Sequence, residues 1–130
     1  MAAHWGFNNR TASLRVLNSS PNATRVEHRI AGADANPYLV LAAILGGIHH
    51  GIVNKLDPGP AAEGNCDGSN APKVPTAWIN AIAQFRDSSA ATETFGAIFQ
   101  KTFAEMKETE RRDFERVVTA LDHQWYARVA

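Results

Sequence analysis

The fold is decided by the stretch RVEHRIAGADANPYLV, residues 25–40, which passes from an alternating pattern to the start of a helix. Side chains alternate between the two faces of a strand, so an extended chain projects Arg25, Glu27 and Arg29 from the same face. Val26 and His28 then lie on the other face. The pattern predicts a strand that carries two guanidinium groups around one carboxylate.

The helix after this strand has a well-marked start, because Asn36 is suited to cap it and Pro37 fits the first helical position. The helix from Pro37 to about Asn54 is apolar on nearly all sides, and its strongly apolar run, Tyr38–Ile48, is too short to span a bilayer. A chain of 130 residues has little material to cover such a helix. We therefore expect an exposed apolar patch and self-association into homo-oligomers.

A second strand is predicted upstream, within NNRTASLRVLN, residues 8–18, which also alternates and carries spaced arginines. Arg10 and Arg15 differ in parity, so Arg10 is expected in the lead-in or at a bulge. The linker SSPNAT favours a turn. The sequence thus predicts an antiparallel hairpin of Thr11–Leu17 with Arg25–Ala31, which gathers four arginines and one glutamate.

This cluster has a specific chemical use. The planar guanidinium fork of Arg grips a phosphate or carboxylate through two hydrogen bonds, which Lys cannot reproduce. A carboxylate such as Glu27 is a ligand type that suits Mg²⁺ or Mn²⁺. Because one carboxylate does not make a metal site, two interpretations remain open: a phosphate and metal site, or a structural ion-pair network.

The second half of the chain is predicted to be helical, after a segment at residues 56–75 whose Gly, Pro, Asn and Asp content favours mobility. Helical spacing resumes at residues 76–88, and a short helix is expected over residues 89–95. One last long helix is then expected, with its apolar side chains in the core: Phe99, Phe103, Met106, Phe114, Val117, Leu121 and Trp125. The fold class is therefore α+β, with an N-terminal hairpin followed by a mostly helical region.

Composition bounds the function. The length of 130 residues fits one domain, and thirteen basic residues balance thirteen acidic ones, so no overall field attracts nucleic acid or an anionic membrane. We expect neither as a partner. The single cysteine, Cys66, has no disulfide partner in the chain and lies beside an aspartate, so we expect an inert thiol. One unpaired cysteine suits a reducing compartment, and the expected location is the cytoplasm.

The elements NNRTASLRV and TRVEHRIAGADANPYLVLAAIL, with the helical tail, resemble the C-terminal part of the catalytic domain of the glutamine synthetase family. The resemblance runs from about Trp5 to the end of the chain and is most specific through Ile48. The segments HWGFNNRT and HHGIVNKLDPG are more similar to sequences of the glutamate–putrescine ligase branch than to those of the ammonia-using enzymes. Residues 1–130 would then form a single partial domain.

The resemblance implies an ATP-dependent glutamate–amine ligase. Such enzymes phosphorylate the side-chain carboxylate of glutamate, and an amine then displaces the phosphate to give a gamma-glutamyl amide. By position, Arg10 and Arg29 would hold the glutamate and the phosphoryl group in transfer, and Arg15 and Arg25 would contact the ATP phosphates. Glu27 would bind the Mg²⁺ or Mn²⁺ ion nearer the nucleotide. The expected amine is putrescine or another small amine.

The family's other metal ligands and its amine pocket lie upstream of the matching region, so the chain is expected to be a fragment or a truncated product that is inactive when isolated. Three alternatives remain open: a fragment of an ammonia-using glutamine synthetase, a non-catalytic partner of a full-length ligase, and a nucleic-acid-binding hairpin. The zero net charge and the scarcity of exposed aromatic residues disfavour the last of these.

Overall fold

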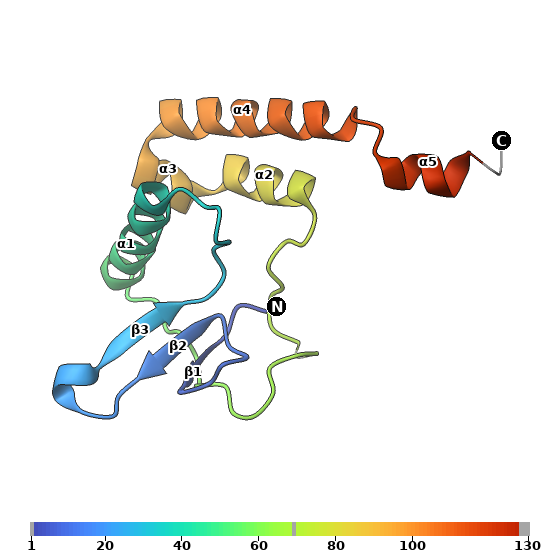
Figure 1. Ribbon diagram of the computed structural model, residues 1–130. Coiled ribbons are helices and arrows are strands. Elements are labelled where there is room, and N and C mark those ends of the chain that lie inside the picture. Colours follow the sequence, from blue (N-terminus) through green and yellow to red (C-terminus); the bar gives the residue numbers. More distant parts are fainter. Residues whose placement is uncertain (1, 69, 128–130) are drawn as a thin grey trace. The chain divides into compact units, whose positions relative to one another are not determined.

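The computed structural model describes residues 2–68 and 70–127. The chain divides into two compact units, Met1–Pro75 and Thr76–Ala130, each of which has its own internal packing. In these described residues, the first unit holds a three-stranded sheet and one α-helix, and the second holds four α-helices (Figure 1). The predicted α+β fold is confirmed.

The predicted hairpin forms the core of the sheet. Strands β2 (Leu14–Leu17) and β3 (Arg25–His28) pair antiparallel, and the register places Arg15 opposite Glu27. Both strands are shorter than predicted, although the pairing continues for one more residue because the N–H of Arg29 donates to the carbonyl of Ser13 at 2.9 Å. A single 3₁₀ turn, Pro21–Ala23, joins the two strands.

The sheet also contains a strand that the sequence pattern did not reveal. Strand β1 (Trp5–Phe7) pairs parallel with β2, so the order is β1-β2-β3. Parallel neighbours usually require a crossover of about a dozen residues or more, whereas here the chain returns through residues 8–13. Asn8 makes this possible by adopting a φ of +49°, a left-handed conformation that Asn tolerates better than most residues.

Helix α1 (Pro37–Val53) begins as predicted, since the Asn36 side chain accepts hydrogen bonds from the N–H groups of Tyr38 and Leu39. None of its residues is buried. Its large apolar side chains are exposed to a degree that is unusual for a globular protein, as at Tyr38, Leu41, Leu45, Ile48, Ile52 and Val53. The expected exposed patch is confirmed, and self-association remains a prediction.

The segment after α1 is attached to the sheet, which differs from the mobility that its composition favours. The backbone N–H of Ala62 donates to the carbonyl of Trp5 at 2.8 Å, and the indole N–H of Trp5 donates to the carbonyl of Gly59 at 3.0 Å. A further isolated bridge joins Ala2 to Lys73. The segment therefore covers the edge of β1 that β2 leaves free, which protects an otherwise unpaired strand edge.

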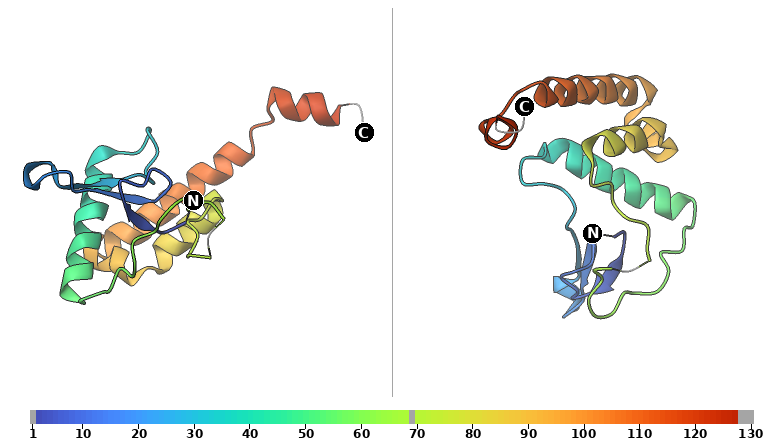
Figure 2. Two further views of the ribbon diagram at one scale, coloured as in Figure 1. Left: turned by 90° about the horizontal axis from the view of Figure 1, so that it is seen from below. Right: turned by 90° about the vertical axis from the view of Figure 1, so that its right-hand side faces the viewer.

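The second unit contains α2 (Trp78–Asp87), α3 (Ser89–Phe95), α4 (Ala97–Glu115) and α5 (Ala120–Tyr126). Helix α4 packs against α2 and α3 (Figure 2). The expectation of one long final helix is wrong, because the chain leaves helical geometry after α4 and a capping box of Thr119 and Asp122 starts α5. Hydrogen bonds from the hydroxyl and backbone of Thr119 lower the pKa of Asp122.

The core of this unit is smaller than the apolar spacing suggested. Four phenylalanine rings form a chain of contacts with centroid distances of 5.3–6.0 Å, namely Phe85, Phe95, Phe99 and Phe103. Phe114 and Trp125, which were expected in the core, are 71% and 62% exposed. The charges of α4 pair along the helix, as Arg111 does with Glu108 and Glu115.

The buried side chain of Gln100 joins α4 to the end of α2. Its amide nitrogen lies 2.7, 3.1 and 2.8 Å from the carbonyl oxygens of Phe85, Arg86 and Ser88. The last carbonyls of a helix lack partners within the helix, and this amide supplies one from α4. The carbonyls of Phe85 and Ser88 also accept from the N–H groups of Ser88 and Thr92. Gln100 thus caps α2 from a neighbouring helix.

We expect Gln100→Ala to destabilise the second unit by about 1–3 kcal/mol, because it removes the hydrogen bonds of a buried amide to the end of α2. The measurement is the urea midpoint of the helical circular dichroism signal of the full chain. Gln84→Ala, an exposed substitution on α2, is the matched control and should change the midpoint little. Equal midpoints for both variants would show that the carbonyls find other partners.

Candidate active site

The hairpin register brings three of the predicted residues together. Arg15 on β2 lies opposite Glu27 on β3, and their Nη1 and Oε2 atoms are 3.1 Å apart. Arg25 lies two residues before Glu27, and its Nη2 is 3.3 Å from the other carboxylate oxygen, Oε1. Each oxygen of Glu27 is therefore engaged by a different arginine, and the group of three carries a net charge of +1.

Arg15 is the most enclosed member of this group, with a side chain that is only 14% exposed. Its second terminal nitrogen donates to the side-chain oxygen of Asn8. Among the described residues, its Nε–H is buried without a hydrogen-bond partner. Burial of an unpaired donor is costly, and an anionic ligand is the kind of group that would satisfy it.

The other two arginines stand apart from this group. Arg10 lies in the turn between β1 and β2, as the parity argument anticipated, and Arg29 follows the end of β3. Across residues 2–68 and 70–127, neither side chain has a hydrogen bond or ion pair. Both side chains are exposed. Two guanidinium groups are thus available to an external anion.

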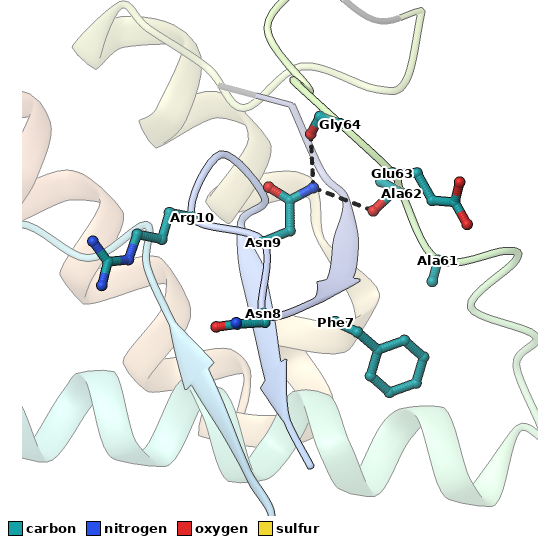
Figure 3. Close-up of a pocket in the computed structure, with 8 residues that line it drawn as sticks. All are labelled: Phe7, Asn8, Asn9, Arg10, Ala61, Ala62, Glu63 and Gly64. Carbon is teal, nitrogen blue, oxygen red and sulfur yellow. Dashed lines mark hydrogen bonds between the residues drawn. The ribbon is translucent and has the colours of Figure 1, made fainter. Parts of the chain in front are cut away.

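Arg10 borders an open pocket of about 620 Å³ between the β1–β2 turn and the segment after α1 (Figure 3). The lining residues are Phe7, Asn8, Asn9, Arg10, Ala61, Ala62, Glu63 and Gly64. In Figure 3, the side chain of Asn9 points to the segment, whereas that of Arg10 extends from the other side of the turn. The hydrogen bonds of Asn9 therefore attach the segment that lines the pocket to the turn that carries Arg10.

Asn8, Asn9 and Thr11 were missed as residues of the site. Their sequence signal was the run NNRT around Arg10, which marks a turn rich in side chains that hydrogen-bond to backbone. The structure shows that Asn8 supports Arg15, whereas Asn9 and Thr11 contact the segment after α1.

The residues present fit an anion better than a complete metal centre. The guanidinium groups of Arg10 and Arg29, which have no ion pair in the described part of the chain, and the unpaired Nε–H of Arg15 suit phosphate oxygens. By contrast, the described part of the chain contains no group of three or more His, Cys, Asp or Glu side chains that could hold a metal ion. Glu27 could supply one carboxylate ligand to Mg²⁺ or Mn²⁺, and the other ligands would have to come from elsewhere.

Comparison with known proteins identifies this arrangement. Residues 1–126 match the family model of the glutamine synthetase catalytic domain. The chain belongs to this family. The match includes the whole hairpin, the β1–β2 turn and α1, so the arginine and glutamate positions lie within the region of family similarity.

Three curated relatives of this member of the glutamine synthetase family are named for different amines. The chain is 38% identical to gamma-glutamylputrescine synthetase of Escherichia coli over 123 residues, which cover 95% of this chain and 26% of the relative. It is 42% identical to glutamate–isopropylamine ligase of Pseudomonas sp. over 106 residues, or 79% of this chain and 23% of the relative. It is 32% identical to gamma-glutamylethanolamide synthetase of Streptomyces coelicolor over 118 residues, which cover 91% of this chain and 25% of the relative.

The chain thus spans about a quarter of the length of these relatives. In residues 2–68 and 70–127, no helix has both the length and the apolar character to cross a membrane.

Proposed function

We propose that this chain forms one part of the active site of an ATP-dependent glutamate–amine ligase, which makes a gamma-glutamyl amide through gamma-glutamyl phosphate. Residues 1–130 act as a single partial domain of a cytoplasmic, oligomeric enzyme. The observation that carries the proposal is the hairpin register, which sets a carboxylate between two arginines. Within the described residues, Arg10 and Arg29 have no ion-pair partner. Family membership supports the same reading.

The chemistry of this site follows from charge. Phosphoryl transfer spreads negative charge over several oxygens, and catalysis depends mainly on positioning these oxygens and stabilising that charge. Arg15 and Arg25 contact the ATP phosphates, and the enclosure of Arg15 fixes its fork. Arg10 and Arg29 hold the glutamate and the phosphoryl group in transfer. Glu27 contributes one ligand to Mg²⁺ or Mn²⁺, which would neutralise further charge on the phosphates.

We further propose that the amine is a small organic amine such as putrescine, because relatives named for putrescine, isopropylamine and ethanolamine match most of this chain. Ammonia is the alternative, since a protein named glutamine synthetase from Pseudomonas aeruginosa is also 34% identical over 129 residues. A non-catalytic partner of a full-length ligase is the second alternative.

A hybrid ligase tests the proposal. The hybrid is the gamma-glutamylputrescine synthetase of Escherichia coli in which the matching 123 residues are replaced by the present chain. Gamma-glutamyl amide formation from glutamate, ATP and an amine would support the catalytic role. A folded hybrid without activity would favour the non-catalytic alternative. Comparison of putrescine, isopropylamine, ethanolamine and ammonia as acceptors would show whether this part of the fold affects amine choice.

The isolated 130-residue chain is expected to form no gamma-glutamyl phosphate, because Glu27 alone cannot hold the divalent ions of a phosphoryl-transfer site. The measurement is glutamate-dependent ATP hydrolysis by the purified chain, with the hybrid ligase as the positive control. Hydrolysis that requires both glutamate and this chain would contradict the expectation.

A further inference from the structure

We infer that Asn9 and Thr11 latch the loop of residues 59–66 onto the β1–β2 turn and thereby position Arg10. This Asn9–Thr11 latch rests on the proposed function in one respect only, namely the catalytic role of Arg10. Its physical existence depends on contacts within the chain and can be tested without activity.

Asn9 makes the central contacts of the latch. Its side-chain Nδ2 donates to the carbonyls of Ala62 and Gly64 at 3.2 and 2.9 Å and lies 3.5 Å from Sγ of Cys66. Its Oδ1 accepts from both the N–H and the hydroxyl of Thr11, at 2.9 and 2.7 Å. One amide therefore connects the turn to the loop and stiffens the turn itself.

Thr11 completes the latch from the other side of Arg10. Its hydroxyl oxygen accepts a hydrogen bond from the N–H of Cys66 at 3.0 Å. Arg10 therefore lies between two residues whose side chains are both attached to the loop. This fixes the backbone from which the Arg10 side chain extends. Figure 3 shows that this side chain points away from the loop.

The close approach of loop and strand depends on Gly6. A Cβ atom at this position would lie 2.7 Å from the carbonyl oxygen of Ala62, closer than real Cβ contacts allow. The N–H of the same Ala62 donates to the carbonyl of Trp5 on β1. Gly6 thus permits the docking that Asn9 and Thr11 secure.

Cys66 supplies a direct probe of the latch, because it is the single cysteine of the chain and is only 6% exposed when the loop is docked. Opening of the loop would expose its thiol, so the rate of reaction with a thiol reagent such as Ellman's reagent reports the open population. Loss of the latch hydrogen bonds should raise this rate by about tenfold or more.

The variants separate hydrogen bonding from shape. Asn9→Asp keeps the size and the Oδ1 acceptor but loses the donor to two carbonyls, and Thr11→Val keeps the shape but loses the acceptor. Gly6→Ala should open the loop sterically. Each of these should accelerate thiol modification. Thr11→Ser retains the hydroxyl, and Asn22→Ala lies in the β2–β3 turn outside the latch, so both should react at the parent rate.

Several results would overturn the latch. A parent-like rate for Asn9→Asp and Thr11→Val would show that shape alone docks the loop. Equal acceleration in all variants, including Asn22→Ala, would indicate general destabilisation, and circular dichroism melting of each variant would detect it independently.

The positioning role is tested in the hybrid ligase by a double-mutant cycle. Asn9→Asp should lower turnover by about tenfold alone but by much less in an Arg10→Lys background, because coupled residues are not additive. If the effects of Asn9→Asp and Arg10→Lys on turnover were fully additive, the inference that Asn9 acts by positioning Arg10 would be wrong. If Arg10→Lys alone leaves turnover unchanged, the proposed catalytic role of Arg10 fails, while the thiol rates still decide whether the latch exists.

Discussion

Arg29→Lys is expected to lower the turnover of the hybrid ligase by roughly a hundredfold to a thousandfold, the usual cost of losing one preorganised charge-stabilising group. Lysine keeps the charge but lacks the planar fork that grips phosphate or carboxylate through two hydrogen bonds. The fold should tolerate the change, because Arg29 is exposed and contacts the sheet through its backbone N–H to Ser13. The measurement is the steady-state rate of gamma-glutamyl amide formation at saturating substrates.

Arg112→Lys on α4 is the matched control, since this arginine is also exposed and lies outside the candidate site. It should retain parent turnover. If Arg29→Lys does the same, a point charge is sufficient at this position and bidentate gripping is not its role.

The hairpin and the start of α1 could be predicted from the sequence because their determinants are local. Alternation fixes the faces of β2 and β3, turn residues set their register, and Asn36 with Pro37 marks the helix start. The Arg15–Glu27 pair follows directly from that register. The sequence pattern is sufficient to predict those elements whose structure is determined by neighbouring residues.

The parts that the sequence did not reveal depend on contacts between distant residues. Strand β1 has only three residues and pairs parallel through an unusually short return. The segment after α1 was expected to be mobile because of its Gly, Pro, Asn and Asp content. Its anchors, Asn9 and Thr11, lie more than fifty residues away in the chain. The spacing of apolar and polar residues in the sequence does not indicate such tertiary hydrogen bonds.

The exposed aromatic and aliphatic side chains have a related origin. The sequence showed that α1 is apolar on nearly all sides and that apolar residues recur at near-helical spacing in α4 and α5, but such patterns do not say what covers these side chains. Val53 and Phe114 are 61% and 71% exposed although their spacing is that of core residues. These side chains are exposed in a chain that spans about a quarter of the length of its curated relatives.

Glu27→Gln is expected to raise the Mg²⁺ concentration needed for half-maximal activity of the hybrid ligase by at least about tenfold, because a neutral amide is a much weaker ligand for a hard cation than a carboxylate. The same change removes the charge that neutralises Arg15, whose side chain is 14% exposed. Magnesium titration separates these effects, since weakened metal binding is overcome at high Mg²⁺, whereas a displaced Arg15 is not.

Glu115→Gln is the control for loss of an ion-paired carboxylate, since Glu115 pairs with Arg111 on α4, outside the candidate site. This substitution should leave the magnesium requirement unchanged. Three results are distinguishable for Glu27→Gln. A raised requirement with recovery at high Mg²⁺ supports a metal ligand. A lower rate at every Mg²⁺ concentration, with an unchanged half-saturation point, would mean that Glu27 serves only to hold Arg15 and Arg25. Parent behaviour in both respects would assign the whole group to a structural ion-pair network.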